Sequence, residues 1–330
     1  MLKFKCAKRW FTVVAVAIFA GCTSLIANAE CCCCEHEGIA QESVSVKNGD
    51  FEISKDGILQ EYYGKNDVVC IPEGVKKISF AVFFNHDEIK QVICPTSLEI
   101  IDEFAFFGCT KLEKVELPRN LKSISRLAFG NCTSLQKIEL PFGVKEVDLQ
   151  AFLSCSSLQK IDVCQENEHF CSVDGMLYNK KIDTLICCPN GKSGVAVVPE
   201  SVINIGEFAC FNCKNLTKIE VKGPLKNIGD GAFYDCGNLT EIKLGNSVEH
   251  IGTYAFGRCL ALKQITIPKT VIEIKDNAFS ETNLERIFVL SKNVKLPEEL
   301  KDMQLTIVTY EDSKAKDFAV ENALGLQILE

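Results

Sequence analysis

The sequence predicts an α/β solenoid with a parallel β-sheet on its concave face and short helical turns on its convex face. The main observation is a pattern that repeats three times without interruption between Pro95 and Cys164, at a spacing of 23 residues. The shared positions are Pro95, Ile101, Ala105, Phe106, Cys109 and Leu112, then Pro118, Ile124, Ala128, Phe129, Cys132 and Leu135, then Pro141, Val147, Ala151, Phe152, Cys155 and Leu158. A fixed period in this range indicates repeats that bury their apolar faces by stacking on one another.

The same period continues on both sides of this block. Upstream, a copy begins at Pro72 and has His86 in the cysteine position. Downstream, a second array begins at Pro199. The last copy, Pro268 to Leu284, is one residue short and has Thr282 in the cysteine position. Degenerate terminal copies are expected of the capping repeats of a solenoid.

These residues resemble the BspA-like leucine-rich repeat family, whose pattern is close to Ile-x-x-x-Ala-Phe-x-x-Cys-x-x-Leu-x-x-Ile-x-Ile-Pro. The match covers about Asp50 to Leu324. The resemblance implies a leucine-rich repeat horseshoe in a surface or secreted microbial protein, often an adhesin, and it implies no catalytic residues. Because one fold can host many functions, the fold carries over more safely than any ligand.

Composition limits the classes of partner. The chain has 330 residues, 47% of them hydrophobic, and a net charge of −8. Residues 1–21 contain four basic groups and no acidic one, so the remainder carries −8 − 4 = −12. A chain this acidic is a poor partner for nucleic acid. A repeat array grows by adding turns, so a single elongated domain is expected.

Residues 1–21 are predicted to be a signal peptide, because a basic start precedes an apolar run too short to span a bilayer. The segment Phe19-Ala20-Gly21-Cys22 resembles a bacterial lipobox, with phenylalanine in place of the usual leucine. It makes Cys22 the predicted lipidation site and membrane anchor. The competing site, Ala27-Asn28-Ala29, predicts a signal peptide of residues 1–29 and ordinary secretion. Both predict export, either to the cell surface or periplasm or into the medium.

Residues 22–49 are predicted to form a cysteine-rich tether. They include Cys31-Cys32-Cys33-Cys34 followed by Glu35-His36-Glu37, which leaves metal binding, intermolecular disulfides or a plain tether open. Structural zinc sites separate their cysteines by two to four residues, which four contiguous cysteines do not. We therefore predict no metal site and no cofactor.

Residues 50–310 are predicted to form the repeat domain, opening with a lead-in of two short strands. One strand per repeat is expected, at Val68–Ile71, Gln91–Cys94, Lys114–Leu117, Lys137–Leu140, Lys160–Val163, Val195–Val198, Lys218–Val221, Glu241–Leu244, Gln264–Ile267 and Arg286–Val289. From Lys160 to Val195 is 195 − 160 = 35 residues, one period plus 12. The excess predicts a hairpin insertion near 165–190, which serves as a structural joint or as a binding loop.

Residues 311–330 are predicted to form a C-terminal capping helix. Ser313 can accept a hydrogen bond as its N-cap, and Gly325 is expected to end it. Residues 305–308 are expected to form the last strand.

The periodic cysteines are predicted to be small buried side chains. Equivalent side chains on stacked repeats point in parallel, which disfavours a disulfide between them. Cys164, Cys171, Cys187 and Cys188 lie off the register and are better disulfide candidates. The pair in Cys210-Phe211-Asn212-Cys213 has thioredoxin-like spacing, but the register places both cysteines in the core.

No catalytic residues are predicted, because none of the four histidines, His36, His86, His169 and His250, lies in a recognisable motif. The most informative surface is the predicted strand face, where side chains flanking each inward isoleucine point outward. Lysines form one column there and carboxylates the next, namely Lys114, Lys137, Lys160 and Lys218 beside Glu116, Glu139, Asp162 and Glu220. This candidate binding surface either neutralises itself by pairing or recognises a polar partner.

The sequence as a whole predicts an exported, non-catalytic leucine-rich repeat protein that mediates adhesion or binds a protein or other macromolecule, with a lipid anchor in a membrane. Two alternatives remain at this point. One is a structural envelope protein cross-linked through Cys31–Cys34, and the other is a cysteine-based redox or metal-binding protein.

Overall fold

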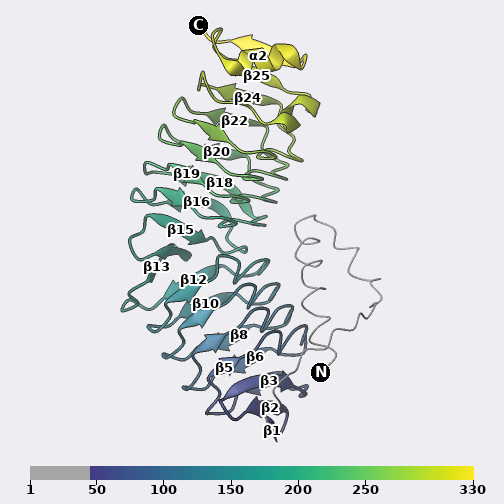
Figure 1. The fold of residues 1–330 in the computed structure, drawn as a ribbon, viewed down its shortest axis with the longest axis vertical. Coiled ribbons are helices and arrows are strands. Elements are labelled where there is room, and N and C mark those ends of the chain that lie inside the picture. Colours follow the sequence, from purple (N-terminus) through teal and green to yellow (C-terminus); the bar gives the residue numbers. More distant parts are fainter. Residues whose placement is uncertain (1–44) are drawn as a thin grey trace, which may run out of the picture. The chain divides into compact units, whose positions relative to one another are not determined.

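The computed structural model describes residues 45–330. The predicted signal peptide, Cys22 and the tract Cys31–Cys34 lie outside the described residues. Each 23-residue copy forms one turn of a coil, here called a rung, and the rungs stack along the coil axis (Figure 1). The predicted solenoid with its parallel strands and 23-residue spacing is confirmed.

The longer strand of each rung, except the last one, β26, coincides with a strand predicted from the sequence. These strands are β4 (Val68–Cys70), β6 (Gln91–Ile93), β8 (Lys114–Glu116), β10 (Lys137–Leu140), β12 (Lys160–Val163), β16 (Gly194–Val198), β18 (Leu216–Val221), β20 (Glu241–Lys243), β22 (Gln264–Ile267), β24 (Arg286–Val289), β25 (Thr306–Thr309) and β26 (Gly325–Ile328). They pair in parallel as β4-β6-β8, β10-β12, β16-β18-β20 and β22-β24-β25-β26. The longer strands thus share one face of the coil, but their hydrogen bonding is interrupted between these groups.

Each regular rung also contains a second, two-residue strand that was not predicted from the sequence. These strands are β5 (Lys77–Ile78), β7 (Ile100–Ile101), β9 (Ser123–Ile124), β11 (Glu146–Val147), β17 (Asn204–Ile205), β19 (Asn227–Ile228), β21 (His250–Ile251) and β23 (Glu273–Ile274). Their second residue is the branched apolar position of the repeat. Two residues are too few to show the alternation that marks a strand in a sequence.

The Ala-Phe-x-x-Cys segments form hydrogen-bonded turns, and they contain no regular helix. In one rung the Phe107 N–H donates to the Phe104 carbonyl at 3.0 Å. Phe104 (φ 57°) and Gly108 (φ 75°) adopt left-handed conformations, which a right-handed helix cannot accommodate. Neighbouring turns are also linked, because the Phe106 N–H donates to the Ala128 carbonyl of the next rung at 2.8 Å.

The core contains two columns of parallel phenylalanine rings. The first is Phe83, Phe106, Phe129 and Phe152, with centroid separations of 4.9, 5.2 and 5.8 Å, and the second is Phe233, Phe256 and Phe279, with separations of 5.5 and 5.7 Å. The rings stack because each one occupies the same position in its rung and the rungs repeat at a fixed period. The columns belong to two separate hydrophobic cores.

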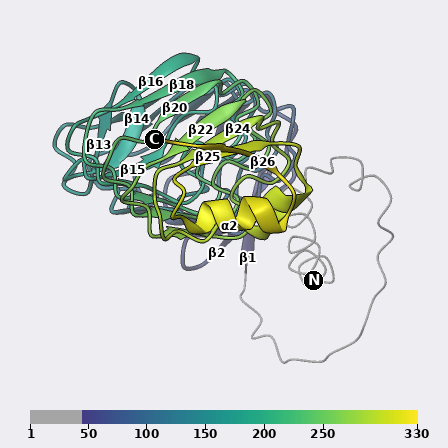
Figure 2. The ribbon, with the colours of Figure 1, turned by 90° about the horizontal axis from the view of Figure 1, so that it is seen from above.

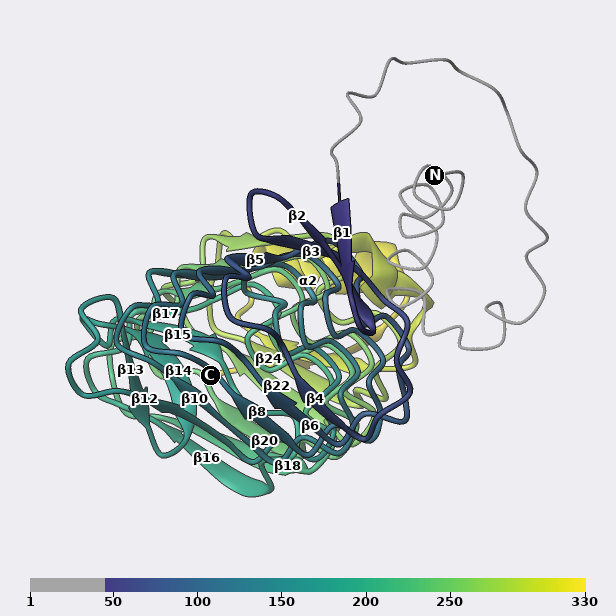
Figure 3. The ribbon, with the colours of Figure 1, turned by 90° about the horizontal axis from the view of Figure 1, so that it is seen from below.

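Each array of rungs opens with the same kind of lead-in. In the first, β1 (Ser45–Asn48), β2 (Phe51–Ser54) and β3 (Ile58–Tyr62) run antiparallel and β3 then pairs in parallel with β5; Figure 3 shows this end of the coil. In the second, β13 (Phe170–Val173), β14 (Met176–Asn179) and β15 (Thr184–Cys187) repeat the arrangement and β15 pairs with β17. The residues of the predicted insertion therefore begin a second array.

This second lead-in forms a wall between the two cores. Leu177 and Ile186 belong to the core of the first array. Met176, Tyr178 and Leu185 belong to the core of the second. Because successive residues of a strand point to opposite sides, one hairpin can close the first array and open the next.

The C-terminal segment differs from its prediction in part. Ser313 caps α2 (Lys314–Glu321) as expected and accepts a hydrogen bond from the Lys316 N–H at 3.1 Å. The helix ends at Glu321, however, and Gly325 begins β26, so the last strand is β26 and not the one predicted at 305–308. The alternating Leu326 and Ile328 fit a strand better than a helix. Figure 2 shows α2 beside β25 and β26, after the short 3₁₀ helix η2 (Glu298–Asp302).

Candidate binding surface

The register of the longer strands builds the two charged columns expected on the strand face. Lys137 lies beside Lys160, and Glu139 lies beside Asp162 on the same two strands. Between these columns the side chain of Ile138 is buried. Because successive side chains of a strand point to opposite faces, burial of every second residue in the core makes the charged side chains point outward.

Most charges of these two columns in the first array are paired. Lys114 contacts Glu116 of the same strand at 2.6 Å. Asp162 accepts from two lysines, Lys137 at 2.9 Å and Lys160 at 2.8 Å. The surface therefore pairs charges both within a strand and between neighbouring rungs, as the sequence predicts.

The pKa values follow these contacts. The hydrogen bond from Lys114 lowers the pKa of Glu116. Partial burial by itself raises the pKa of Asp162, but the hydrogen bonds from Lys160 and Lys137 outweigh burial and lower it overall. Both carboxylates are held in the charged form at neutral pH.

In the second array the column that contains Lys218 continues with a negative residue, Glu241, so the charge along the column changes sign. Lys218 pairs with Glu220 at 3.0 Å and with Glu241 of the next rung at 3.5 Å. Glu241 also pairs with Lys243 at 3.4 Å. The candidate residues thus form two groups, one on β8, β10 and β12 and one on β18, on either side of the second lead-in.

Glu139 is the exception among the candidate residues. It is exposed and has no cation within 4 Å among the residues that the structure describes. Exposed ion pairs contribute about 0–1 kcal/mol, so a partner can replace them at low cost. Among the candidate residues, all of which lie in the described part of the chain, Glu139 is thus a free carboxylate beside several exchangeable pairs.

The turn of the second lead-in is fixed to the strand face. The Ile161 N–H donates to the Gly175 carbonyl at 2.9 Å. Lys192, whose side chain is only 12% exposed, donates to the carboxylate and the carbonyl of Asp174, both at 2.8 Å. Gly175 has φ of 74°, and a Cβ there would lie 2.9 Å from the Lys160 side chain. These contacts favour the structural joint over the binding loop.

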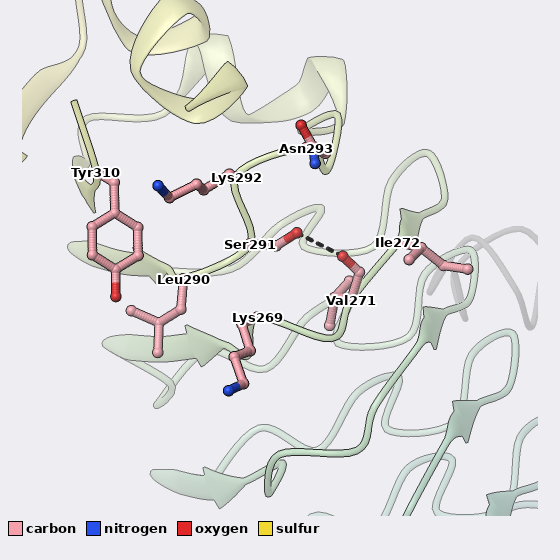
Figure 4. A pocket seen from close by; sticks show the side chains of 8 residues that line it. All are labelled: Lys269, Val271, Ile272, Leu290, Ser291, Lys292, Asn293 and Tyr310. Atoms are coloured by element: carbon pink, nitrogen blue, oxygen red, sulfur yellow. Dashed lines mark hydrogen bonds between the residues drawn. The ribbon is translucent and has the colours of Figure 1, made fainter. Parts of the chain in front are cut away.

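A second candidate site lies where β22, β24 and β25 end, in the pocket of about 430 Å³ shown in Figure 4. Its lining residues are Lys269, Val271, Ile272, Leu290, Ser291, Lys292, Asn293 and Tyr310. Lys292 lies 5.5 Å from the centroid of the Tyr310 ring and pairs with Asp312 at 2.8 Å. The ammonium group of Lys269, the Lys292–Asp312 pair and an apolar wall together form a site of mixed polarity, as small-molecule pockets commonly are. The sequence pattern does not predict this pocket, although the shortened last copy marks its position.

The periodic cysteines are buried as predicted, and each also makes a hydrogen bond that the pattern does not reveal. The thiols donate to a carbonyl of the preceding rung, namely Cys109 to Phe83, Cys132 to Phe106, Cys155 to Phe129, Cys236 to Cys210 and Cys259 to Phe233, at 3.0–3.2 Å. Burial raises the pKa of Cys132 well above its usual value. These thiols are structural hydrogen-bond donors.

The disulfide expected among Cys164, Cys171, Cys187 and Cys188 is absent from the described part of the chain, where every cysteine is a free thiol. The alternation of the strand explains part of this result. Cys187 packs against the first core and Cys188 against the second, so the two side chains diverge.

Residues 45–330 contain no cluster of three or more residues able to hold a metal ion. Two of the histidines pair with carboxylates, His86 with Glu88 at 2.8 Å and His250 with Glu273 at 3.0 Å. No helix between residues 45 and 330 is long and apolar enough to cross a bilayer.

Comparison with known proteins gives one family and several related folds. The BspA-type leucine-rich repeat family matches residues 62–174 and 187–300 in six copies. No curated protein matches the chain.

Three crystal structures are similar at 20% identity. A leucine-rich cell surface protein from Faecalibacterium prausnitzii aligns over 85% of this chain and 98% of its own with a TM-score of 0.53. The pneumococcal vaccine antigen PcpA aligns over 88% and 100% with a TM-score of 0.56. A leucine-rich repeat protein from Eubacterium ventriosum aligns over 78% and 84% with a TM-score of 0.54. At this identity the likeness shows the fold alone.

Proposed function

Because this chain belongs to the BspA-type leucine-rich repeat family, we propose that it is a non-catalytic protein that binds another protein or macromolecule through its strand face. The observation that carries the proposal is the pair of charged columns on β8, β10, β12 and β18, whose exposed or half-buried side chains, most of them in ion pairs, stand on a rigid frame. The family and the cell surface protein among the similar structures support a role in protein interaction.

The geometry favours recognition by charge exchange. Lys137 and Lys160 share a single carboxylate, Asp162, so a second carboxylate from a partner can approach either lysine. Glu139, which has no ion pair with any residue of the described part of the chain, offers the complementary contact for a basic group of the same partner. Complementary charges of this kind raise the association rate and fix the orientation more than they raise affinity.

Charge reversal tests the proposal. A pull-down with the exported portion of the protein first identifies the partner. The triple variant Lys114→Glu, Lys137→Glu, Lys160→Glu should then associate at least about tenfold more slowly and with a flatter salt dependence. The matched control is Lys122→Glu, Lys145→Glu, Lys226→Glu, which changes the net charge equally on rung segments next to the two-residue strands. Equal binding by both triple variants would contradict a strand-face site.

We also propose that the protein is exported and held by a lipid on Cys22. The lipobox-like segment and the cell surface protein among the similar structures support this proposal. Cys22→Ser removes the thiol that carries the lipid, so the variant should leave the membrane fraction. A mature protein whose intact mass begins at Glu30 would show ordinary signal-peptide cleavage and contradict the anchor.

A further inference from the structure

The second core is open at its C-terminal end. The strands β22, β24 and β25 each place two inward side chains in this core, all at most 2% exposed, namely Ile265, Ile287 and Ile307 in one column and Ile267, Val289 and Thr309 in the other. The last strand, β26, continues both columns, because Leu326 lies beside Ile307 and Ile328 lies beside Thr309. Leu326 and Ile328 are nevertheless each 37% exposed. They are inward apolar side chains that no further rung of the described chain covers.

One edge of β26 also has no neighbouring strand. Among the described residues, β26 is the last strand of the sheet β22-β24-β25-β26, and Figure 2 shows it at this end of the coil. The N–H groups of Gly325 and Leu329 donate to carbonyls of the β25 segment at 3.1 and 2.8 Å. Because the backbone groups of successive strand residues point to alternate sides, the N–H and C=O groups of Leu326 and Ile328 point to the outer edge.

The edge of β26 lacks the features that usually keep strand edges apart. Natural proteins protect such edges with charged residues, prolines or β-bulges. The β26 sequence, Gly-Leu-Gln-Ile, contains no charge and no proline, and its register against β25 is unbroken. The outermost strand at the other end of the coil, β1, contains Lys47. The uncharged edge of β26 therefore suits a second uncharged strand.

We propose that β26 is an interface between two copies of this chain, which pair their β26 strands antiparallel about a two-fold axis at Gln327. In this register Leu326 of each copy lies opposite Ile328 of the other. Since these two residues carry the backbone groups that point to the outer edge, each such pair exchanges both of its backbone hydrogen bonds. The interface is self-complementary, as two-fold symmetry requires.

The two-fold pairing also covers the open end of the core. Residues opposite one another in an antiparallel pair place their side chains on the same face, so Leu326 of one copy packs against Ile328 of the other. The two second cores then meet across the axis. A strand from an unrelated peptide could satisfy the same backbone groups, but it would have to bring apolar side chains at both inward positions. A second β26 supplies them itself.

The proposed dimer places both strand faces on one side. The two-fold axis of an antiparallel strand pair is perpendicular to the sheet, so the sheet of the second copy continues with the same face outward. The charged columns of the two copies would then face the same way, and a partner with two sites could bind both at once. This consequence rests on the proposed function of the strand face, whereas the dimer itself does not.

Sedimentation of the full chain over a range of protein concentrations tests the dimer. A reductant is present, so that cysteines cannot link copies covalently. We expect an equilibrium between monomer and dimer. Monomers at every concentration would overturn the proposal, as would a series of ever larger assemblies, which a head-to-tail contact between β26 and β1 would produce.

A proline variant tests the role of the strand edge. Ile328→Pro removes an N–H group that faces the outer edge and none that bonds to β25, and proline is tolerated at such positions of edge strands. We expect the dissociation constant of the dimer to rise at least about tenfold, because two hydrogen bonds are lost across the axis. The unfolding temperature of the monomer should stay nearly the same. An unchanged dissociation constant would overturn the edge pairing.

A charge exchange at Gln327 tests the register without relying on proline. Gln327→Glu and Gln327→Lys each place two like charges opposite one another, so each variant alone should raise the dissociation constant at least about threefold at low salt. An equal mixture of the two variants should recover dimers that contain one copy of each. A mixture that stays as weak as its components would overturn the two-fold register.

Gln264 provides the matched control, because it is an exposed glutamine on β22 of the same sheet, away from the edge. Gln264→Glu and Gln264→Lys change the net charge by the same amounts as the Gln327 variants. They should leave the dissociation constant unchanged. If they weaken the dimer as much as the Gln327 variants do, the effect is one of net charge and the proposed register is wrong.

Discussion

The two arrays are built from the same kind of rung, but they differ in the side chains with which they begin. In the first, the ring of Tyr62 in the lead-in lies 5.1 Å from Phe83, and aromatic stacking continues from there. In the second, Cys188 and Cys210 take the first two places of the column, and Tyr178 of the lead-in is fully buried in that core. The repeat determines the geometry of a rung, but the side chains at the start of an array adapt to the lead-in that covers it.

The arrays also differ after their two-residue strands. The first has Asp102, whose carboxylate accepts from the next backbone N–H at 2.9 Å. At the corresponding positions, three successive rungs of the second array each have a glycine, namely Gly206, Gly229 and Gly252. A Cβ at Gly252 would lie 2.6 Å from the backbone nitrogen of Asp230, so only glycine fits this approach. The same corner is therefore held by a polar side chain in one array and by close backbone packing in the other.

The largest expected contrast is between a ring of the first column and Cys210, a cysteine that stands where a ring would begin the second column. Phe129→Ala should cost about 3–5 kcal/mol in free energy of unfolding, because it removes a fully buried ring between two others. Cys210→Ala, at the same position of the repeat but in the first rung of the second array, should cost only about 1–2 kcal/mol, since it removes a single sulfur atom. Denaturant titrations of the two variants measure the difference. Equal losses of free energy of unfolding in the two variants would contradict the view that the first rung of the second array is packed differently from the rungs of the first array.

The second contrast concerns the end of the first array. Asn167 is fully buried; its amide donates to the carbonyls of Pro141, Phe142 and Val144, and its oxygen accepts from the N–H groups of His169 and Phe170. Asn167→Ala leaves these buried groups unpaired and should cost about 2–4 kcal/mol.

Asn238→Ala is the matched control, because Asn238 is exposed and donates to one carbonyl of the second array at 2.8 Å. Its loss should stay within about 0.5 kcal/mol in the same denaturant titration. A cost for Asn167→Ala as small as that of the control would mean that water replaces its hydrogen bonds.

A smaller effect tests the cysteine column. Cys132→Ala should cost about 1–2 kcal/mol, from a small cavity and from the lost donor to the Phe106 carbonyl. Cys132→Leu should cost at least as much through overpacking. Exposed Lys137→Ala should remain within about 0.5 kcal/mol. Rapid reaction of Cys132 with a thiol reagent in the native protein would contradict the assigned register.

The smallest effect is the pH dependence of the paired strand face. The pKa of Asp162 in the folded protein lies below its usual value of 3.8, so its ion pairs stabilise the fold above that pH. The contribution is lost as the pH falls through the lowered folded pKa. Asp162→Asn should remove this part of the acid dependence and leave stability near pH 7 slightly reduced. An unchanged slope between pH 5 and pH 2 would show that the pairs contribute nothing.

The rungs were predictable from the sequence because a 23-residue period repeats every contact that forms them. Pro95 to Cys164 alone specifies the strand positions, the buried cysteines and the charged columns. The two-residue strands and the thiol hydrogen bonds were not predictable, since they depend on backbone geometry that apolar periodicity does not encode. The pocket near Tyr310 escaped prediction because it arises where the period shortens.

The second lead-in shows the same limit in another form. An excess of residues between Lys160 and Val195 predicts a hairpin, and the Asp174-Gly175 turn places it. The excess cannot show that Leu177 and Tyr178 face different cores, because both are large apolar residues. That assignment requires the register of β14 against β13 and β15.

The most direct test of the two-array account compares Leu177→Ala with Tyr178→Ala by hydrogen exchange and mass spectrometry. The two residues are adjacent and fully buried, yet Leu177 lies in the first core and Tyr178 in the second. In a solenoid, destabilisation spreads mainly to neighbouring rungs. Leu177→Ala should therefore speed exchange mainly in β10 and β12, and Tyr178→Ala mainly in β16 and β18. Faster exchange in the same array for both variants would contradict the account.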